Sequence, residues 1–527
     1  MTLVLNNLKK LINKNNFYLL LIIISSVFFT SYTGFKGIFP IDSFLIFDAG
    51  FKIINNYHPF RDYWSITGPF LDYVQFIFFK ILGVNWTAYV LHAAVINVVL
   101  SLVTFYFFCQ IGLKRNFAFI YAFSISILGY PSVGTPFMDH HASILSLIAL
   151  MALILGIKKN SNIYWFSIPI LLGFSFFSKQ IPSAYLGFLF LVIIFTFLIV
   201  KKFKKTQFLN FLFYGLTTFI IICFLIVSLN NISLKNIFIQ YVLYPINIGE
   251  ERSANINFDL EKVLLQFKFI YFSLIILIVP GFYLVRLKKK KFKNLIDVII
   301  LFSFLFSVFI FIYSQLMTKN QILIFFLIPF CIGMTHYYLD NYYKNEKFIY
   351  ILIFIIIIST VKFHIRFNIE KKFMELSTVN FKLAEEGRFL HPKLKGLDWI
   401  TPNYPNNPRK ELLLLKDLSV KIKNEKRNKI IISDYQILPS ITDTNNFAPN
   451  KWFDDLSVPK SNNKYYKIYK RFFESNLKEK NIQVIFIVGK NKFNYLSNHF
   501  LDKNCYTSNE INEIAIRLNI EKCNFEY

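Results

Sequence analysis

The first 365 residues consist of long apolar runs separated by short polar breaks. Runs of about 17–25 apolar residues have the length that a helix needs to cross a bilayer. The first run is followed by no small-residue cleavage site, so we expect it to remain as a span. The fold class that we predict is a polytopic α-helical membrane protein. Its spans, about eleven in number, are expected near residues 17–33, 88–111, 117–132, 141–157, 162–177, 182–200, 209–229, 267–285, 295–313, 321–339 and 347–362.

Basic residues gather before the first span and in the breaks that follow even-numbered spans. Positively charged loops remain on the cytoplasmic side, so we expect a cytoplasmic N-terminus. An odd number of spans then makes the C-terminal tail extracytoplasmic. The Lys-, Asn-, Ile- and Phe-rich composition is typical of an AT-rich bacterial genome, which favours the bacterial plasma (inner) membrane. The clusters contain Lys9, Lys10, Lys14, Lys114, Arg115, Lys158, Lys159, Lys201, Lys202, Lys204, Lys205, Arg286, Lys288, Lys289, Lys290, Lys291, Lys293, Lys344 and Lys347.

The composition of the tail differs from that of the membrane region. We predict a membrane domain over residues 1–365, with an outer loop at 34–87, and an extracytoplasmic α/β domain over 366–527. Lys429–Tyr435 and Ile482–Val488 have the pattern of buried strands, and Glu411–Lys423 that of an amphipathic helix. Cys505 and Cys523 both lie in this exported tail, where a disulfide is one alternative.

The formal charge of +27 invites a nucleic-acid interpretation, but the distribution of the charges argues against one. The cations occupy short loops between apolar runs, whereas a nucleic-acid interface needs them on one face of a folded domain. With 55% hydrophobic and 17% charged residues, the chain has more apolar surface than a soluble core absorbs. We therefore expect membrane lipids, and no nucleic acid, as partners.

The outer loop contains two early carboxylates, Asp42 and Asp48. A separation of six residues turns a helix by about 120°, so the two are not expected to share one face. Asp42 has an alternative structural role, since Pro40-Ile41-Asp42 is also a helix-start signal. Phe70–Leu82 is too short and Phe-rich for a span, and is expected to lie along the membrane interface.

Two further polar positions interrupt apolar sequence on the same predicted side. Asp139 and His140 directly precede the fourth span, and Lys179-Gln180 lies at the tip between the fifth and sixth spans. Asp139 has the alternative role of a helix N-cap, and Lys179 that of a lysine extending to lipid headgroups. Adjacent histidines diverge on a helix, so His140 and His141 alone are a poor metal-chelating pair.

Other outer-side residues add charge and aromatic surface, although each taken singly suits a solvated loop. Together, carboxylates and cations at one membrane surface suit a reaction on an anionic lipid. This set contains Arg61 and Trp64 in the first outer loop, Glu250 and Arg252 in the loop before the eighth span, and Lys319 before the tenth.

The order of these motifs resembles the GT-C superfamily of polyprenyl-phosphate-sugar-dependent glycosyltransferases. The resemblance is to the dolichyl-phosphate-mannose–protein mannosyltransferase-like branch, which is similar to bacterial transferases that add aminoarabinose to lipid A. It covers residues 15–365 in layout. The residues that carry it are Asp42, Pro59-Phe60-Arg61-Asp62-Tyr63-Trp64, Gly68-Pro69-Phe70, Asp139, Ser178-Lys179-Gln180, Asn320-Gln321 and Ile328-Pro329-Phe330.

The resemblance implies transfer of a sugar from a polyprenyl-phosphate donor to an extracytoplasmic glycan, lipid or protein, with inversion. It implies catalytic carboxylates among Asp42, Asp48 and Asp139. Contacts with the donor phosphate would come from Arg61, Lys179, Gln180, Arg252 and Lys319. His140, Trp64 and Glu250 would line the acceptor side of the site.

Several alternatives stay open at the level of sequence. Many relatives carry an Asp-Glu pair where this chain has Asp42-Ser43, so either Asp42 or Asp48 could be the base. The same departure weakens the case for a carboxylate-pair metal site, and a divalent cation is left open. The competing functions are a lipid-linked oligosaccharide flippase or transporter, a glycan polymerase or ligase, and a nonenzymatic scaffold. A transporter would be expected to show internal repeats and helices broken at mid-membrane, which the sequence does not show clearly.

Overall fold

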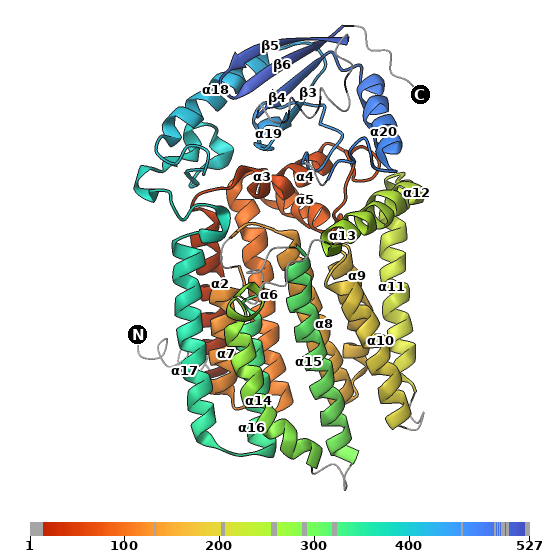
Figure 1. Ribbon diagram of the computed structural model, residues 1–527, viewed down its shortest axis with the longest axis vertical. Helices are drawn as coiled ribbons and strands as arrows, with labels where there is room; N and C mark the ends of the chain where they lie inside the picture. Colours follow the sequence, from red (N-terminus) through yellow and green to blue (C-terminus); the bar gives the residue numbers. More distant parts are fainter. Residues whose placement is uncertain are drawn as a thin grey trace, which may run out of the picture.

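The computed structural model describes residues 14–130, 133–201, 206–254, 261–286, 292–318, 324–454, 457–489, 492, 494, 496, 501 and 505–521. A bundle of long helices forms one end of the molecule, and a smaller domain containing a β-sheet is stacked on the other end (Figure 1). This arrangement confirms the predicted fold class of a helical membrane protein with a C-terminal α/β region.

Each predicted span corresponds to a helix in the structure. Seven of the described helices are long and apolar enough to cross a membrane, and α7, α9 and α14 contribute shorter apolar stretches. The shorter α16 accounts for the remaining predicted span. The bounds are α2 (Lys14–Gly34), α6 (Trp86–Ile111), α7 (Arg115–Leu128), α8 (Met138–Lys159), α9 (Asn162–Phe176), α10 (Ser183–Val200), α11 (Phe208–Leu229), α14 (Lys268–Arg286), α15 (Phe292–Thr318), α16 (Leu327–Tyr342) and α17 (Glu346–Phe363).

The helices differ widely in how much protein surrounds them. The apolar window of α8 is 100% buried inside the protein, whereas that of α11 is only 6% buried. The helix α8 is therefore the central helix of the bundle, and α11 presents most of its surface to lipid. Hydroxyl contacts fix α8 against α9, because Ser175 Oγ lies 2.8 Å from Ser146 Oγ and donates to the Ala142 carbonyl at 2.7 Å.

Short helices cover the end of the bundle beneath the C-terminal domain (Figure 1). The segment expected at the membrane interface, residues 70–82, is a helix, as predicted. These outer elements are α3 (Pro40–Ser43), α4 (Leu45–Ile54), α5 (Phe70–Leu82), α12 (Leu234–Ile237), the π-helix η1 (Phe238–Leu243) and α13 (Tyr244–Ala254). A second π-helix, η2 (Glu261–Leu265), precedes α14, and a third, η4 (His364–Ile369), continues α17.

The C-terminal domain contains a four-stranded sheet with the order β3-β4-β6-β5. The two segments predicted as strands form its parallel pair β3–β4, while β6 is antiparallel to both β4 and β5. The helix predicted at 411–423 is α18 (Pro408–Asn424). The other elements are β1 (Glu385–Glu386), β2 (Asp398–Trp399), β3 (Lys429–Ser433), α19 (Leu438–Ile441), α20 (Tyr466–Glu479), β4 (Val484–Val488), β5 (Tyr506–Asn512) and β6 (Ala515–Ile520).

The C-terminal domain shares a hydrophobic core with the outer helices. Phe44 and Trp399 stack with ring centroids 5.9 Å apart. Polar contacts reinforce this interface, because Lys451 Nζ forms a buried ion pair with Asp72 Oδ1 at 2.6 Å. Cys505 is disulfide-bonded, while Cys523 lies outside the described residues. The boundary at 365/366 stays a prediction.

Gly68 brings the first outer loop against the turn between α9 and α10. Its N–H donates to the Ser178 carbonyl at 3.3 Å, and Phe70 N–H donates to the Phe177 carbonyl at 3.0 Å. A Cβ at position 68 would overlap the backbone of Phe177. We therefore expect Gly68→Ala to lower the free energy of unfolding by about 1–3 kcal/mol through overpacking, measurable by thermal unfolding in detergent.

Gly187→Ala is the matched control, since nothing lies within 4 Å of a Cβ at that position of α10. Alanine is favoured over glycine inside a helix, so this variant should melt at or above the wild-type temperature. Equal melting of Gly68→Ala and wild type would contradict the close backbone approach.

Candidate active site

Asp139 and Lys179 meet at the end of the bundle beneath the C-terminal domain. Lys179 Nζ lies 2.6 Å from Asp139 Oδ1, and the two side chains are 16% and 5% exposed. Asp139 lies in the first turn of α8, whose N-cap is Phe137 without a side-chain cap bond. The capping alternative for Asp139 is therefore wrong, and its carboxylate instead binds Lys179.

The turn between α9 and α10 holds Lys179 in place through local hydrogen bonds. Lys179 N–H donates to the Ser175 carbonyl at 3.0 Å, and Ser178 Oγ donates to the Phe174 carbonyl at 2.9 Å. Because Ser175 also contacts α8, the same residue links the turn to the helix that carries Asp139. The ion pair thus joins the first turn of α8 to the α9–α10 turn.

Asp42 completes this group from the short helix α3. Its N-cap is Phe39, whose N–H donates to Ser43 Oγ at 3.0 Å, so Asp42 does not cap the helix through its side chain. Burial is the main cause, and the Asp139 carboxylate the second, of a pKa of Asp42 that is raised from 3.8 to about 7. The positive charge of Lys179 lowers the pKa of Asp42.

The C-terminal domain adds charged residues to the same neighbourhood. The carboxylates of Asp434 and Asp454 also raise the pKa of Asp42. Asp434 follows β3 and pairs with Lys492 at 2.6 Å. Three carboxylates and a lysine from distant parts of the sequence therefore act on Asp42. Sequence reasoning missed Asp434, Asp454 and Lys492, and nothing in their local sequence signals this proximity.

Asp48 lies in a separate environment. Its carboxylate pairs with Lys52 Nζ at 2.8 Å, and both side chains are under 5% exposed. Lys52 also donates to the Asn450 carbonyl at 3.0 Å, which links α4 to the C-terminal domain. Asp42 and Asp48 lie on separate helices, α3 and α4, and Asp48 Oδ1 is buried without a hydrogen-bond partner among the described residues.

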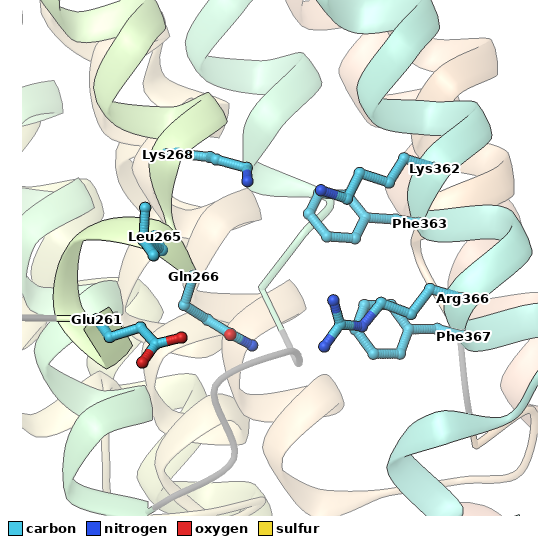
Figure 2. A pocket seen from close by; sticks show the side chains of 8 residues that line it. All are labelled: Glu261, Leu265, Gln266, Lys268, Lys362, Phe363, Arg366 and Phe367. Atoms are coloured by element: carbon cyan, nitrogen blue, oxygen red, sulfur yellow. The ribbon is translucent and has the colours of Figure 1, made fainter. Parts of the chain in front are cut away.

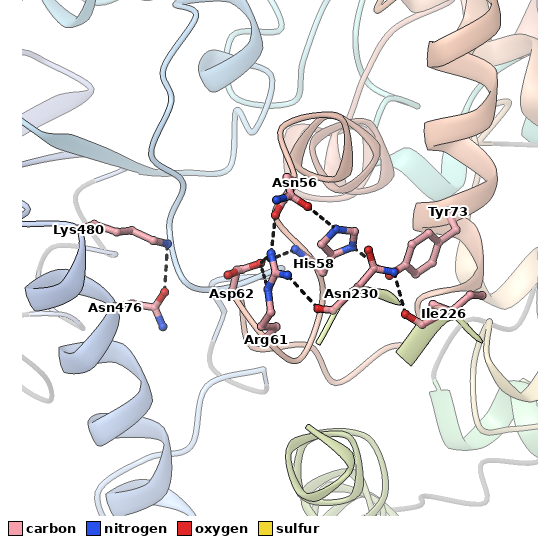
Figure 3. Close-up of polar contacts among 9 residues, drawn as sticks. All are labelled: Asn56, His58, Arg61, Asp62, Tyr73, Ile226, Asn230, Asn476 and Lys480. Atoms are coloured by element: carbon pink, nitrogen blue, oxygen red, sulfur yellow. Dashed lines mark hydrogen bonds and ion pairs between the residues drawn. The ribbon is translucent and has the colours of Figure 1, made fainter. Parts of the chain in front are cut away.

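The guanidinium of Arg61 is occupied by protein groups (Figure 3). Nε donates to Asp62 Oδ2 at 2.9 Å, Nη1 to the Asn230 carbonyl at 2.8 Å and Nη2 to the Asn56 carbonyl at 2.6 Å. His58 N–H also donates to Asp62 Oδ2, at 2.7 Å. In this conformation Arg61 links the outer loop to the C-terminal end of α11 through hydrogen bonds.

Gln180 has a similar linking role. Its amide nitrogen donates to the carbonyls of Ile66 at 3.0 Å and Tyr241 at 2.9 Å. Both amide protons are therefore used by the two loops that flank the α9–α10 turn. The motif residues Arg61 and Gln180 hold the loops around Lys179.

The predicted acceptor-side residues occupy different places. His140 is fully buried and stacks on Tyr130 with ring centroids 4.5 Å apart. Trp64 is buried in the interface with the C-terminal domain, 5.3 Å from the Tyr469 ring. Glu250 is exposed on α13, two residues before the half-buried Arg252. Lys319, predicted as a donor contact, lies outside the described residues.

A buried polar chain below Asp139 was not predicted from the sequence. Gln75 Oε1 lies 2.9 Å from His92 Nδ1, and His92 Nε2 lies 3.1 Å from His141 Nε2. The hydroxyl of Tyr130 then contacts His141 Nδ1 at 2.6 Å. These contacts hold the start of α8 against α5 and α6. Within the described ranges, no group of three or more His, Cys, Asp or Glu side chains is arranged to hold a metal ion.

The helix bundle, the short outer helices and the α/β domain stacked on them form an ArnT-like membrane fold. The crystal structure of ArnT from Cupriavidus metallidurans bound to undecaprenyl phosphate shares this fold, with a TM-score of 0.50. The match covers 96% of this chain and 97% of ArnT at 11% sequence identity, and therefore confirms the expected resemblance in fold. No protein-family model matches the chain, and no curated protein matches its sequence.

Proposed function

We propose that this chain is a membrane glycosyltransferase that moves a sugar from a polyprenyl-phosphate donor to an extracytoplasmic acceptor. The observation that carries the proposal is the Asp139–Lys179 ion pair, whose two charges both act on the pKa of Asp42, at one end of a GT-C-type bundle. The ArnT structure with the same fold was bound to undecaprenyl phosphate, which supports a polyprenyl lipid as the donor. A bacterial inner membrane with the C-terminal domain outside suits this chemistry.

Asp42 is the proposed general base. The hydroxyl of the acceptor is a poor nucleophile and needs a carboxylate to take its proton. A base works best with a pKa near the working pH, and Asp42 has a pKa raised to about 7. Attack of the acceptor oxygen on the anomeric carbon forms the new glycosidic bond, and the proton passes to Asp42. Attack opposite the leaving phosphate gives inversion.

Lys179 is the proposed contact for the departing phosphate. The bond between the anomeric carbon and the phosphate oxygen breaks, leaving the negative charge on the polyprenyl phosphate. A lysine ammonium has three N–H donors, so Lys179 can contact a phosphate while it keeps its bond to Asp139. Fixed positive charge at this point stabilises the transition state. Asp139 acts by positioning Lys179 and the acceptor.

Arg61 and Gln180 are proposed to act through the loops that they hold, since protein carbonyls and Asp62 occupy their donors. Arg252 and Lys319 stay proposed donor contacts. His140, Trp64 and Glu250 stay proposed acceptor-side residues, and Asp48 is the alternative base.

The test is transfer of a radiolabelled sugar from membrane-extracted polyprenyl-phosphate sugars to envelope acceptors by the purified, reconstituted protein. The initial rate should rise with pH through about 7 and level off above it, since only ionised Asp42 accepts the proton. Release of polyprenyl phosphate should accompany transfer in equal amounts. Movement of intact lipid-linked sugar across vesicles without cleavage would favour the flippase and overturn the proposal.

A further inference from the structure

A pocket with a basic wall lies between the start of α14 and the junction of α17 with η4. Figure 2 shows Lys268, Lys362 and Arg366 directed into the same space, with Glu261 and Gln266 on the side of η2. The pocket has a volume of about 390 Å³. Its lining residues are Glu261, Leu265, Gln266, Lys268, Lys362, Phe363, Arg366 and Phe367. None of them belongs to the group around Asp42.

Three cations face one carboxylate, Glu261, across this pocket. Within the described ranges, Lys268, Lys362 and Arg366 form no ion pair, and the positive charges of Lys268 and Arg366 both act on Lys362. Arg366 Nε is buried and has no hydrogen-bond partner among the described residues. Burying a charged donor without a partner is costly, so a bound anion would relieve both the repulsion and the missing bond.

Aromatic rings form the apolar base of the pocket. Phe363 stacks on Phe325 with centroids 3.9 Å apart, and Phe367 stacks on Phe325 at 5.4 Å. The ring of Phe269 lies 5.9 Å from Lys268 Nζ and 5.6 Å from Lys362 Nζ. These contacts hold the two ammonium groups above an apolar surface.

Exposed apolar side chains continue this surface outward. Leu264, Leu265 and Ile365 are 50%, 55% and 44% exposed on the elements that form the pocket. Exposed leucines and isoleucines at the end of a membrane bundle suit contact with lipid chains. The pocket therefore combines cations for a head group with an apolar surface for a hydrocarbon chain.

From this combination we propose that the pocket binds the phosphate group of a membrane lipid, at a place separate from the Asp42 group. Arg366 and Lys362 provide charge-assisted hydrogen bonds to the phosphate oxygens, and Lys268 adds a third cation at the entrance. The phosphate belongs to an isoprenoid phosphate or to a glycerophospholipid, which share this chemistry. The site does not depend on the proposed transferase activity, and direct binding tests it.

The experiment measures binding to the full-length protein in phosphatidylcholine nanodiscs by microscale thermophoresis. The probes are farnesyl phosphate, a short-chain phosphatidylglycerol and inorganic phosphate. We expect at least one lipid probe to bind more than tenfold more tightly than inorganic phosphate. Lys362→Gln/Arg366→Gln should weaken that binding about tenfold or more, through loss of two charge-assisted bonds. The tighter lipid identifies the source of the phosphate.

Lys268→Gln provides an independent variant, because Lys268 is exposed and its replacement should not disturb folding. It should weaken lipid binding severalfold while the melting temperature stays unchanged. Lys347→Gln is the matched control, since it removes an exposed cation from the opposite end of α17 and should bind like wild type. Equal lipid binding by wild type, Lys268→Gln and the double variant would overturn the proposal, as would equal affinity for inorganic phosphate and both lipids.

Discussion

Asp42→Asn is expected to lower the rate of sugar transfer by about 10²–10⁴-fold, the usual contribution of a general base. Asparagine retains the size of the side chain but cannot accept the proton of the acceptor hydroxyl. Because the two side chains are isosteric, the substitution removes the ionisable group without opening a cavity. The measurement is the initial rate of transfer in reconstituted vesicles, together with the loss of its pH dependence near 7.

The control for Asp42→Asn is Asp417→Asn, which removes an exposed carboxylate paired with Lys421 on α18. It should transfer sugar at the wild-type rate. The competing base is tested with Asp48→Asn/Lys52→Met, because removing Asp48 alone would leave Lys52 buried without its partner. If this double variant is folded and inactive while Asp42→Asn retains transfer, the base is Asp48.

Lys451→Met is expected to destabilise the interface between the C-terminal domain and the outer helices by about 3–5 kcal/mol, the cost of breaking a buried ion pair. Lys451 and Asp72 are 3% and 0% exposed, and Tyr63 also donates to Asp72 at 3.1 Å. Without Lys451, the Asp72 charge is buried and poorly compensated. Thermal unfolding in detergent and limited proteolysis of the C-terminal domain measure the effect.

A variant without both charges distinguishes the stabilisation that the ion pair provides from the destabilisation that an unpaired buried charge causes. Lys451→Met/Asp72→Asn should be more stable than Lys451→Met, because no unpaired carboxylate remains. Lys410→Met is the surface control. Its pair with Glu513 is nearly half exposed, so this variant should melt and resist proteolysis like wild type. Wild-type melting and proteolysis of Lys451→Met would show that the pair does not hold the domain.

The helices and the two parallel strands were predictable because their signals are local. A long apolar run predicts a membrane span, and short runs rich in Ile and Val predict β3 and β4. These features depend on residues that are near one another in the chain.

Long-range partners account for what the sequence could not predict. Nothing next to Arg61 indicates that its guanidinium also binds carbonyls of Asn56 and Asn230, which occupy its donors. The approach of Asp434 and Asp454 to Asp42 depends on how the C-terminal domain docks. The docked interface contains a buried lysine, Lys451, a residue type that hydrophobic patterns assign to the surface.

The complete enclosure of α8 has a consequence for biogenesis. In the finished protein, α8 is surrounded by protein. It is synthesised before its neighbours α9, α10 and α15, so it must first enter lipid. The middle of α8 therefore has to be apolar enough for membrane insertion and also has to pack against its final neighbours. Charged substitutions there are expected to hinder insertion even where the completed bundle could accommodate them. The sequence of α8 is thus selected by a lipid environment that the mature helix no longer contacts.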